Sequence, residues 1–133
     1  MSSLKIDRSI DVEEEIREAL SDYIKCYVRP LPANFEVPSI LITAVGGSTE
    51  NTVDYFDVTL DSRATEDAVA LDNLRNAVGI VTAIAKNQST KLRFATVNNL
   101  GSWGKDPVRP ELAMCTARLR VIAHTETVEV NTL

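Results

Sequence analysis

The side chains of this sequence that could do chemistry are few and lie far apart along the chain. The 133 residues include one histidine, His124. A hydrolytic triad would have to use this imidazole as its base, and zinc sites that need several His and Cys ligands are almost excluded. His124 ends a segment of alternating, strand-like sequence, and the sequence places no serine beside it. We interpret His124 as a strand-end residue, and we expect no catalytic residue, no cofactor and no metal ion.

A glycine-rich stretch, Gly46-Gly47-Ser48-Thr49, superficially resembles a loop that cradles phosphate groups. It lacks the G-x-x-x-x-G-K-[ST] spacing of such loops. It also leads into a strand-like segment, whereas a phosphate-binding loop opens the N-terminus of a helix. The stretch is therefore interpreted as a turn.

Three aspartates, Asp54, Asp57 and Asp61, could be imagined as ligands of a cation. Successive side chains of a strand point to opposite faces, so Asp57 and Asp61 share one face while Asp54 points away. Their spacing also differs from that of a calcium-binding loop. We interpret them as solvated or interface charges.

Basic residues gather on two strand-like segments that we expect to be neighbours. Arg118 and Arg120 share the polar face of one, and two more cations lie in residues 91–93. These charges could form a binding strip, pair across strands with Asp57 and Asp61, or remain solvated. They could also pair between subunits, where exposed pairs worth about 0–1 kcal/mol would tune orientation more than strength.

The longest stretch without regular periodicity spans residues 97–111 and holds the only tryptophan, Trp103. Compact domains usually join neighbouring strands by about two to five residues, so this length indicates a loop kept for contact or placement. Glycines on both sides of the tryptophan allow a tight path, and two prolines stiffen the return. Trp103 either folds over the end of the core or is buried in a contact with a partner.

The N-terminal part of the chain predicts an arm followed by a helix. Residues 1–10 show no sustained period and are expected to be an arm. Asp11 and Glu14 fit a capping box, and apolar residues recur at three- and four-residue steps as far as Tyr27. Pro30 would end this helix.

A mostly apolar, β-branched run predicts a buried strand at residues 39–45, and period-two alternation predicts three more at 53–61, 91–97 and 113–123. A 3.6-residue period predicts a second helix over 65–86. The first two strands are expected to form a hairpin. Residues 125–133 would extend the last strand or form a C-terminal arm. Gly79, inside the second helix, is tolerable if that helix approaches the sheet closely.

The expected fold is α+β, in the order α-β-β-α-β-β and in one domain, residues 1–133. Hairpins before and after the long helix favour a four-stranded, mainly antiparallel sheet with both helices packed on one face.

Composition narrows the class of protein. Hydrophobic residues make up 44% of the sequence and charged residues 25%, which is typical of a folded globular domain. The longest apolar run is far shorter than a bilayer-spanning helix, and the N-terminus lacks the features of a signal peptide, so we expect a cytosolic protein without a membrane span. Cys26 and Cys115 are expected to be buried free thiols. A net charge of −5 disfavours a surface that grips phosphates.

Four stretches of the chain resemble neck sequences of tailed bacteriophages, of the tail terminator and head-to-tail joining type. They are G-G-S-T-E-N-T-V (residues 46–53), V-T-L-D-S-R-A (58–64), L-R-N-A-V-G-I (74–80) and N-N-L-G-S-W-G-K-D-P-V-R-P-E-L-A (98–113). The resemblance extends from the first helix to the last strand and includes the chain length and the expected order of elements.

The resemblance implies a structural protein, not an enzyme, whose subunits close into a ring that is usually six-fold. The ring would cap the tail tube protein, join it to the head connector or head-completion protein, and let DNA pass through its lumen. An acidic wall suits this passage because it repels phosphates. The expected location is the virion neck, and the host cytoplasm during assembly.

From the resemblance and the loop we expect two sets of contact residues. The first set, for contacts between subunits or with the adjoining ring, is Trp103, Lys105, Asp106 and Arg109. The second set lies in the glycine-rich turn and comprises Gly46, Gly47, Ser48, Glu50 and Asn51. Two alternatives stay open: a head-completion or minor capsid role at the connector, and a small cytosolic ligand-binding domain or enzyme.

Overall fold

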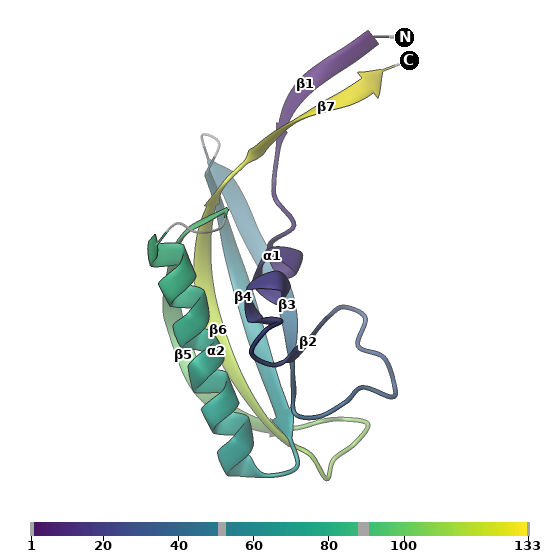
Figure 1. Ribbon diagram of the computed structural model, residues 1–133, viewed down its shortest axis with the longest axis vertical. Coiled ribbons are helices and arrows are strands. Elements are labelled where there is room, and N and C mark those ends of the chain that lie inside the picture. The colour runs from purple at the N-terminus through teal and green to yellow at the C-terminus, as the bar shows by residue number, and fades with distance from the viewer. Residues whose placement is uncertain (1, 51–52, 88–90, 133) are drawn as a thin grey trace.

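The computed structural model describes residues 2–50, 53–87 and 91–132, which contain two helices and seven strands (Figure 1). In chain order they are β1 (Ser2–Arg8), α1 (Val12–Leu20), β2 (Lys25–Val28), β3 (Ser39–Glu50), β4 (Val53–Ala64), α2 (Asp67–Asn87), β5 (Leu92–Lys105), β6 (Ala113–His124) and β7 (Glu126–Thr132). The strands form a five-stranded sheet, ordered β2-β3-β4-β6-β5, and a two-stranded sheet of β1 with β7. The predicted four-stranded sheet and α-β-β-α-β-β order are therefore wrong.

Strand β2 occupies a segment for which the sequence predicts helix. The predicted helix reaches Tyr27, but α1 ends at Leu20, whose carbonyl oxygen accepts from the backbone N–H groups of Tyr23 at 2.9 Å and Ile24 at 3.0 Å. The chain then pairs in parallel with β3, with Cys26 opposite Ile40. The spacing of the two tyrosines fits one helix face, and the long-range pairing with β3 overrides that local pattern.

Strands β1 and β7 form a ribbon from the two segments that the sequence predicts as arms. Ser2 lies opposite Thr132 and Arg8 lies opposite Glu126, in an antiparallel register without a shift. The ribbon leaves the main sheet where β6 ends and projects from the body, with both chain ends at its tip (Figure 1). The two segments alternate only weakly between polar and apolar residues, so neither sequence indicates that its pairing partner lies more than a hundred residues away.

Strand β5 is twice as long as predicted, and it takes up most of the expected loop. It continues past Val97 to Lys105 and pairs with β6 throughout, with three register shifts. One shift lies between Leu100 and Ser102, where Gly101 has φ 90°, a backbone conformation that side chains disfavour. These β-bulges break the alternation, so the segment lacks the period of a strand. The irregular connection that remains spans residues 106–112.

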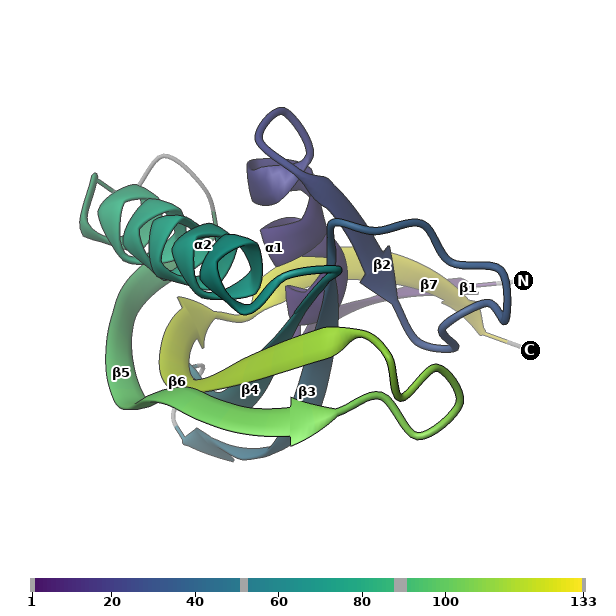
Figure 2. The same ribbon diagram turned by 90° about the horizontal axis from the view of Figure 1, so that it is seen from below.

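Both helices cover the same face of the five-stranded sheet, and the other face carries no helix (Figures 1 and 2). Asp11 caps α1 by accepting from the backbone N–H of Glu14 at 3.2 Å, as the sequence predicts. The core between helices and sheet includes fully buried Ile16, Leu20, Ile40, Ile42, Leu60, Leu74, Leu92 and Leu119. The predicted hairpin of β3 and β4 is present, and its register places Leu60 opposite Ile42.

Helix α2 is long and apolar enough to cross a membrane, by length and composition alone. One side of it is buried in the core, through Ala70, Leu74, Ala77, Val78, Val81 and Ala85. Gly79 lies on the other side, where an added Cβ would meet nothing within 4 Å. A close approach of α2 to the sheet, the condition under which the glycine would be tolerable, is therefore not what Gly79 serves.

Candidate functional site

One of the two edge strands of the main sheet is β5, which carries two of the predicted contact residues. Trp103 lies opposite Cys115 and is 52% exposed. Lys105 ends the strand opposite Ala113 and is exposed. Val97 and Leu100, on the same strand, are also exposed. An edge strand with several exposed apolar side chains offers unpaired backbone groups and apolar area together, which is typical of a contact surface.

Asp106, predicted as a contact residue, is buried inside the chain. Its Oδ2 lies 2.9 Å from Nε of Arg63, and its Oδ1 accepts from the backbone N–H groups of Val108 and Arg109 at 3.0 and 2.6 Å. Burial by itself raises the pKa of Asp106, but the hydrogen bonds from Arg109, Arg63 and Val108 outweigh it and hold the pKa below its ordinary value of 3.8. Asp106 thus fixes the loop and offers no charge to a partner.

Arg109 also acts within the chain in this structure. Its Nη1 donates to the backbone carbonyl of Phe35 at 2.9 Å, and its guanidinium lies 4.7 Å from the centre of the Phe35 ring. The guanidinium of Arg63 lies 5.7 Å from the same ring. Phe35, 5% exposed, therefore ties the segment between β2 and β3 to the loop after β5.

Sequence reasoning misses Arg63 and Phe35, although part of this cluster has a local signature. An aspartate that accepts from the N–H groups two and three residues ahead is a common turn, and Asp106-Pro107-Val108-Arg109 fits it. The partners from other parts of the chain have no such signature. Arg63 ends an alternating strand and Phe35 lies in a segment without periodicity, so only the fold shows that they meet.

The glycine-rich segment, predicted as a turn, is strand as far as Glu50. Gly46, Gly47, Ser48 and Glu50 are all exposed, and Asn51 lies outside the described residues. An added Cβ on Gly47 would lie 2.2 Å from the carbonyl oxygen of Tyr55 on β4, so only glycine allows this approach of the two strands. Gly47 has a structural role whether or not the segment contacts a partner.

The charges on the helix-free face, which we call the open face, are partly paired within the chain. Arg120 Nε lies 3.3 Å from Asp57 Oδ1, and Asp61 Oδ1 accepts from Thr116 Oγ1 at 2.6 Å. Arg118 is exposed and has neither an ion pair nor a hydrogen bond through its side chain to any described residue. One of the two predicted arginines therefore pairs across strands, and the guanidinium of the other has no partner within the described part of the chain.

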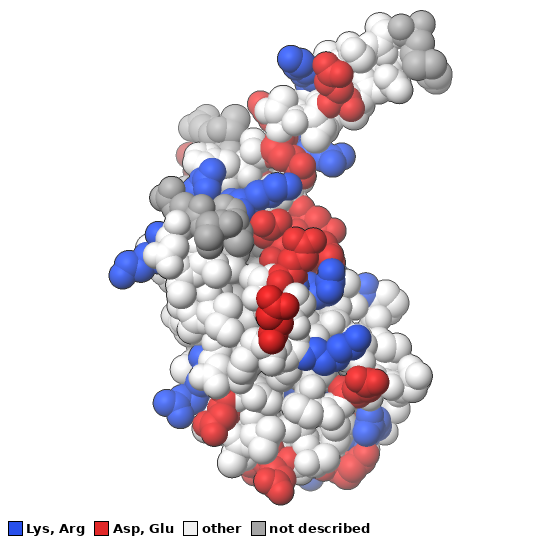
Figure 3. All heavy atoms as spheres, viewed as in Figure 1, with Lys and Arg blue, Asp and Glu red and all other residues white. Residues whose placement is uncertain are grey.

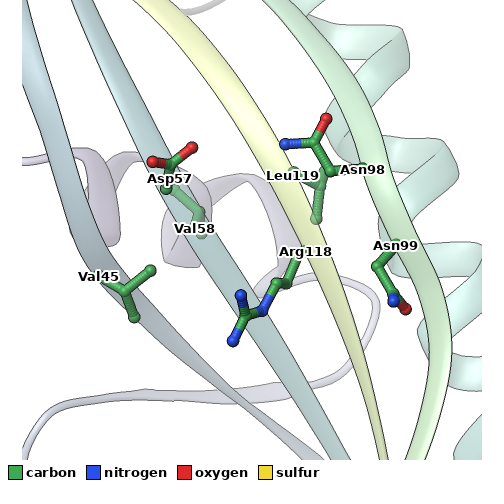
Figure 4. A pocket seen from close by; sticks show the side chains of 7 residues that line it. All are labelled: Val45, Asp57, Val58, Asn98, Asn99, Arg118 and Leu119. Atoms are coloured by element: carbon green, nitrogen blue, oxygen red, sulfur yellow. The ribbon is translucent and has the colours of Figure 1, made fainter.

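A hollow of about 420 Å³ surrounds Arg118 on the open face (Figure 4). Its lining includes Val45, Asp57, Asn98 and Asn99, and the Arg118 side chain extends from β6 toward Val45. We call it the Arg118 hollow. It lies at the level of the sheet where β3 and β5 each have a β-bulge.

The strand register shows that the two bulges lie side by side across β3, β4, β6 and β5. Ala44 lies opposite Val58, which lies opposite Leu119, which lies opposite Val97. The register shifts directly after Ala44 on β3 and directly after Val97 on β5. Bulges bend their strands and increase the local twist, so a pair of them on opposite sides of β4 and β6 hollows the sheet at this level.

A second hollow of about 330 Å³ continues along β5 and β6. Its lining includes Trp103, Ser102 and Thr116, and it shares Asn99 and Arg118 with the first. The structure thus brings Trp103 and Arg118 to one continuous depression. Trp103 is in the first set of predicted contact residues and Arg118 is one of the charges that could pair between subunits, and the sequence gives no indication that they meet.

The other candidate residues are dispersed. His124 is exposed at the end of β6, opposite Val53. Asp54 is buried and accepts from Thr49 Oγ1 at 2.6 Å, while Asp57 and Asp61 lie on the open face, as the alternation predicts. In the part of the chain that the structure describes, no three His, Cys, Asp or Glu side chains gather in a way that could hold a metal ion.

Acidic side chains gather over α1 on the helix-covered side of the molecule (Figure 3). From its cap to its end, this helix carries Asp11, Glu13, Glu14, Glu15 and Glu18 against one basic residue, Arg17. Glu14 pairs with Arg17, and Glu13 pairs with Arg29 at 2.9 Å. Glu18, and Asp22 in the turn that follows α1, are exposed, and neither side chain has an ion pair or a hydrogen bond to a described residue.

One face of the β1–β7 ribbon is apolar in its middle, between the polar pairs Ser2–Thr132 and Arg8–Glu126, and the other face is polar. Leu4 lies opposite Val130 and Ile6 lies opposite Val128, so all four share a face. Leu4 is 54% exposed, and the other three are half-buried. A two-stranded ribbon is marginally stable by itself in water, and an exposed apolar face of this kind is typical of a contact surface.

No protein-family model matches the sequence, and no curated protein sequence matches it.

Proposed function

We propose that this chain is a structural subunit of the neck of a tailed bacteriophage. Its copies form a ring, six-fold in the commonest case for such proteins, that terminates the tail tube and joins it to the head connector. DNA passes through the lumen without specific binding. The protein acts in the virion and is assembled in the host cytoplasm.

The observation that carries the proposal is the projecting β1–β7 ribbon with its uncovered apolar face, built around Leu4 and Val130. The open face and the exposed residues of β5 add further surface that one copy leaves uncovered. An enzyme gathers its reactive groups in one enclosed place, whereas here the uncovered features are spread over an edge, a face and an arm. Such a distribution suits a subunit with several neighbours.

Electrostatics also support the proposal. The chain has a net charge of −5, so a ring of several copies would be strongly acidic. A wall of this sign repels DNA phosphates and does not hold DNA that must move through the lumen.

The test is a phage lacking a functional copy of this gene, examined by electron microscopy. We expect DNA-filled heads without tails, and separate tails of irregular length. Supplying the purified protein to such a lysate should restore joined particles. A label on the protein should appear as a ring between tail tube and connector. Normal, joined particles in the absence of the protein would contradict the proposal.

The same experiment separates the alternatives. A head-completion or minor capsid protein would remain on the head when tails are missing, and its label would lie on the connector alone. A small ligand-binding domain or enzyme would form no ring and would bind a small molecule in stoichiometric amount.

A further inference from the structure

The Arg118 hollow offers hydrogen-bond donors that the chain itself does not use. Arg118 has no partner among the described residues, and the side-chain amides of Asn98 and Asn99 line the same hollow. Asp57, the one carboxylate in the lining, is paired with Arg120 at 3.3 Å. A guanidinium and two amides in a concave site suit a carboxylate, which accepts several hydrogen bonds at once.

Unpaired carboxylates of the same chain lie on the opposite side of the molecule. Glu18 and Asp22 are four residues apart and exposed, and in the described part of the chain neither carboxylate has an ion pair or a hydrogen bond, although Glu18 lies in the field of Arg17. Around them, α1 with its cap carries five acidic residues and one basic residue, a net charge of −4. Figure 3 shows this side as the acidic centre of the view.

We propose that the acidic outer side of α1 in one copy docks into the Arg118 hollow of the next copy, with Glu18 and Asp22 facing Arg118. This contact rests on the proposed function, because it assumes that copies of the chain associate. It names the surfaces through which they do so.

The placement of the two surfaces makes the contact head-to-tail. Helix α1 covers one face of the sheet and Arg118 lies on the other, so the two surfaces cannot meet within one copy. A contact between different surfaces repeats from copy to copy, and it gives a closed ring when the rotation closes. A symmetric dimer through one surface would leave the other without a partner.

Charge complementarity favours a second copy as the occupant over nucleic acid. A strand of DNA entering the Arg118 hollow would meet one cation, Arg118, among the described residues of its lining, and the chain as a whole has a net charge of −5. Helix α1 instead holds Glu18 on a rigid element, and Asp22 lies in the turn directly after it, so little backbone freedom is lost when this side docks. The Arg118 guanidinium can bind one of these carboxylates in a forked geometry.

The test is charge reversal and its rescue, measured on the full chain by sedimentation velocity and native mass spectrometry. We expect Arg118→Glu, and separately Glu18→Arg with Asp22→Arg, to raise the dissociation constant of the assembly by about tenfold or more. The triple variant that carries all three changes should assemble again, because the charges are exchanged. Arg75→Glu, an exposed arginine on α2, is the matched control and should assemble like the wild type.

Added salt should weaken the wild-type assembly, since the contact is charged and partly exposed. Circular dichroism must show that each variant is folded. The contact is overturned if Arg118→Glu assembles like the wild type, if the folded triple variant stays dissociated, or if the wild-type chain remains monomeric at all concentrations.

Failure of the contact and failure of the proposed function are distinguishable. Phage carrying Arg118→Glu with normally joined particles would overturn the contact and leave the neck role intact. The converse result is a triple variant that assembles again while phage without the protein still join their tails. That result would support the contact and contradict the neck role.

Discussion

Arg63 Nε lies 2.9 Å from Asp106 Oδ2, and this ion pair joins the end of β4 to the loop that follows β5. Both side chains are buried, with 7% and 4% of their surface exposed. Asp106 also accepts two backbone hydrogen bonds from its own loop, so one carboxylate fixes both the turn and its attachment to the sheet. A buried pair of this kind is costly to break because the remaining charge stays away from water.

Asp106→Asn should therefore destabilise the chain by about 3–5 kcal/mol, because it leaves the Arg63 guanidinium buried without its counter-charge. Urea denaturation followed by circular dichroism measures the change. Asp72→Asn is the control, since Asp72 is 69% exposed and its pair with Arg75 spans 3.7 Å; its effect should stay within about 0.5 kcal/mol. Equal effects of the two substitutions would refute the structural role of the pair.

The same ion pair makes stability depend on pH. Burial raises the pKa of Asp106, but its hydrogen bonds hold the folded-state pKa below the ordinary value of 3.8. A group with a depressed folded-state pKa contributes stability above its unfolded pKa and loses it as the pH falls through the folded value. The stability difference between wild type and Asp106→Asn should be full near neutral pH and should shrink as the pH falls below about 3.8. A difference that stays constant with pH would contradict this assignment.

Two glycines should respond in opposite directions to the same substitution. Gly79→Ala should stabilise the chain by about 0.5–1 kcal/mol, because the site is helical and an added Cβ meets nothing within 4 Å. Gly47→Ala should destabilise it by at least about 1 kcal/mol, since its Cβ would lie 2.2 Å from the Tyr55 carbonyl oxygen and must displace a strand. Thermal unfolding of both variants beside wild type is the measurement. A stabilising Gly47→Ala would refute the close approach of β3 and β4.

The start of α1, helix α2 and part or all of β3, β4, β5 and β6 could be predicted because their patterns are local. Asp11 with Glu14 marks the start of α1, and the period of α2 is continuous over its length. Strand β2 and the ribbon could not be predicted, because their stability comes from partners distant in sequence, such as Ser2 with Thr132. In β5 the bulge at Gly101 shifts the alternation, so a continuous strand has the pattern of a loop.

The candidate site shows the same division. Single residues such as Trp103 and Arg118 can be singled out from the sequence by type and by predicted face. Their meeting along one depression depends on bulges after Ala44 and Val97 falling in the same row. Nothing in the sequence shows that these two bulges lie at the same level, because that depends on how the strands pair. The burial of Asp106 likewise follows from Arg63, which is 43 residues away.

Both thiols should react slowly while the chain is folded. Burial raises the pKa of Cys26 to about 11, with Arg17 opposing the shift, and burial also raises the pKa of Cys115. The thiolate is the reactive form, so little of it is present near neutral pH. A disulfide reagent such as DTNB should label both thiols only after denaturation. Ser48→Cys, at an exposed position of β3, should add one thiol that reacts at once in the folded protein. Fast labelling of the native wild type would contradict the burial.

The apolar face of the ribbon should be needed for assembly and not for folding. Leu4→Thr with Val130→Thr keeps two strand-forming residues in directly opposite positions but removes apolar area. Because the ribbon projects from the body, the stability of the body should change by no more than about 0.5 kcal/mol. Tail joining in a complementation assay should nevertheless fall sharply, since the face loses the area that a neighbour covers. Lys5→Thr with Glu129→Thr alters the other face of the same ribbon and should leave joining unchanged. If both double variants join tails equally well, the apolar face has no role in assembly and the proposed function loses the observation that carries it.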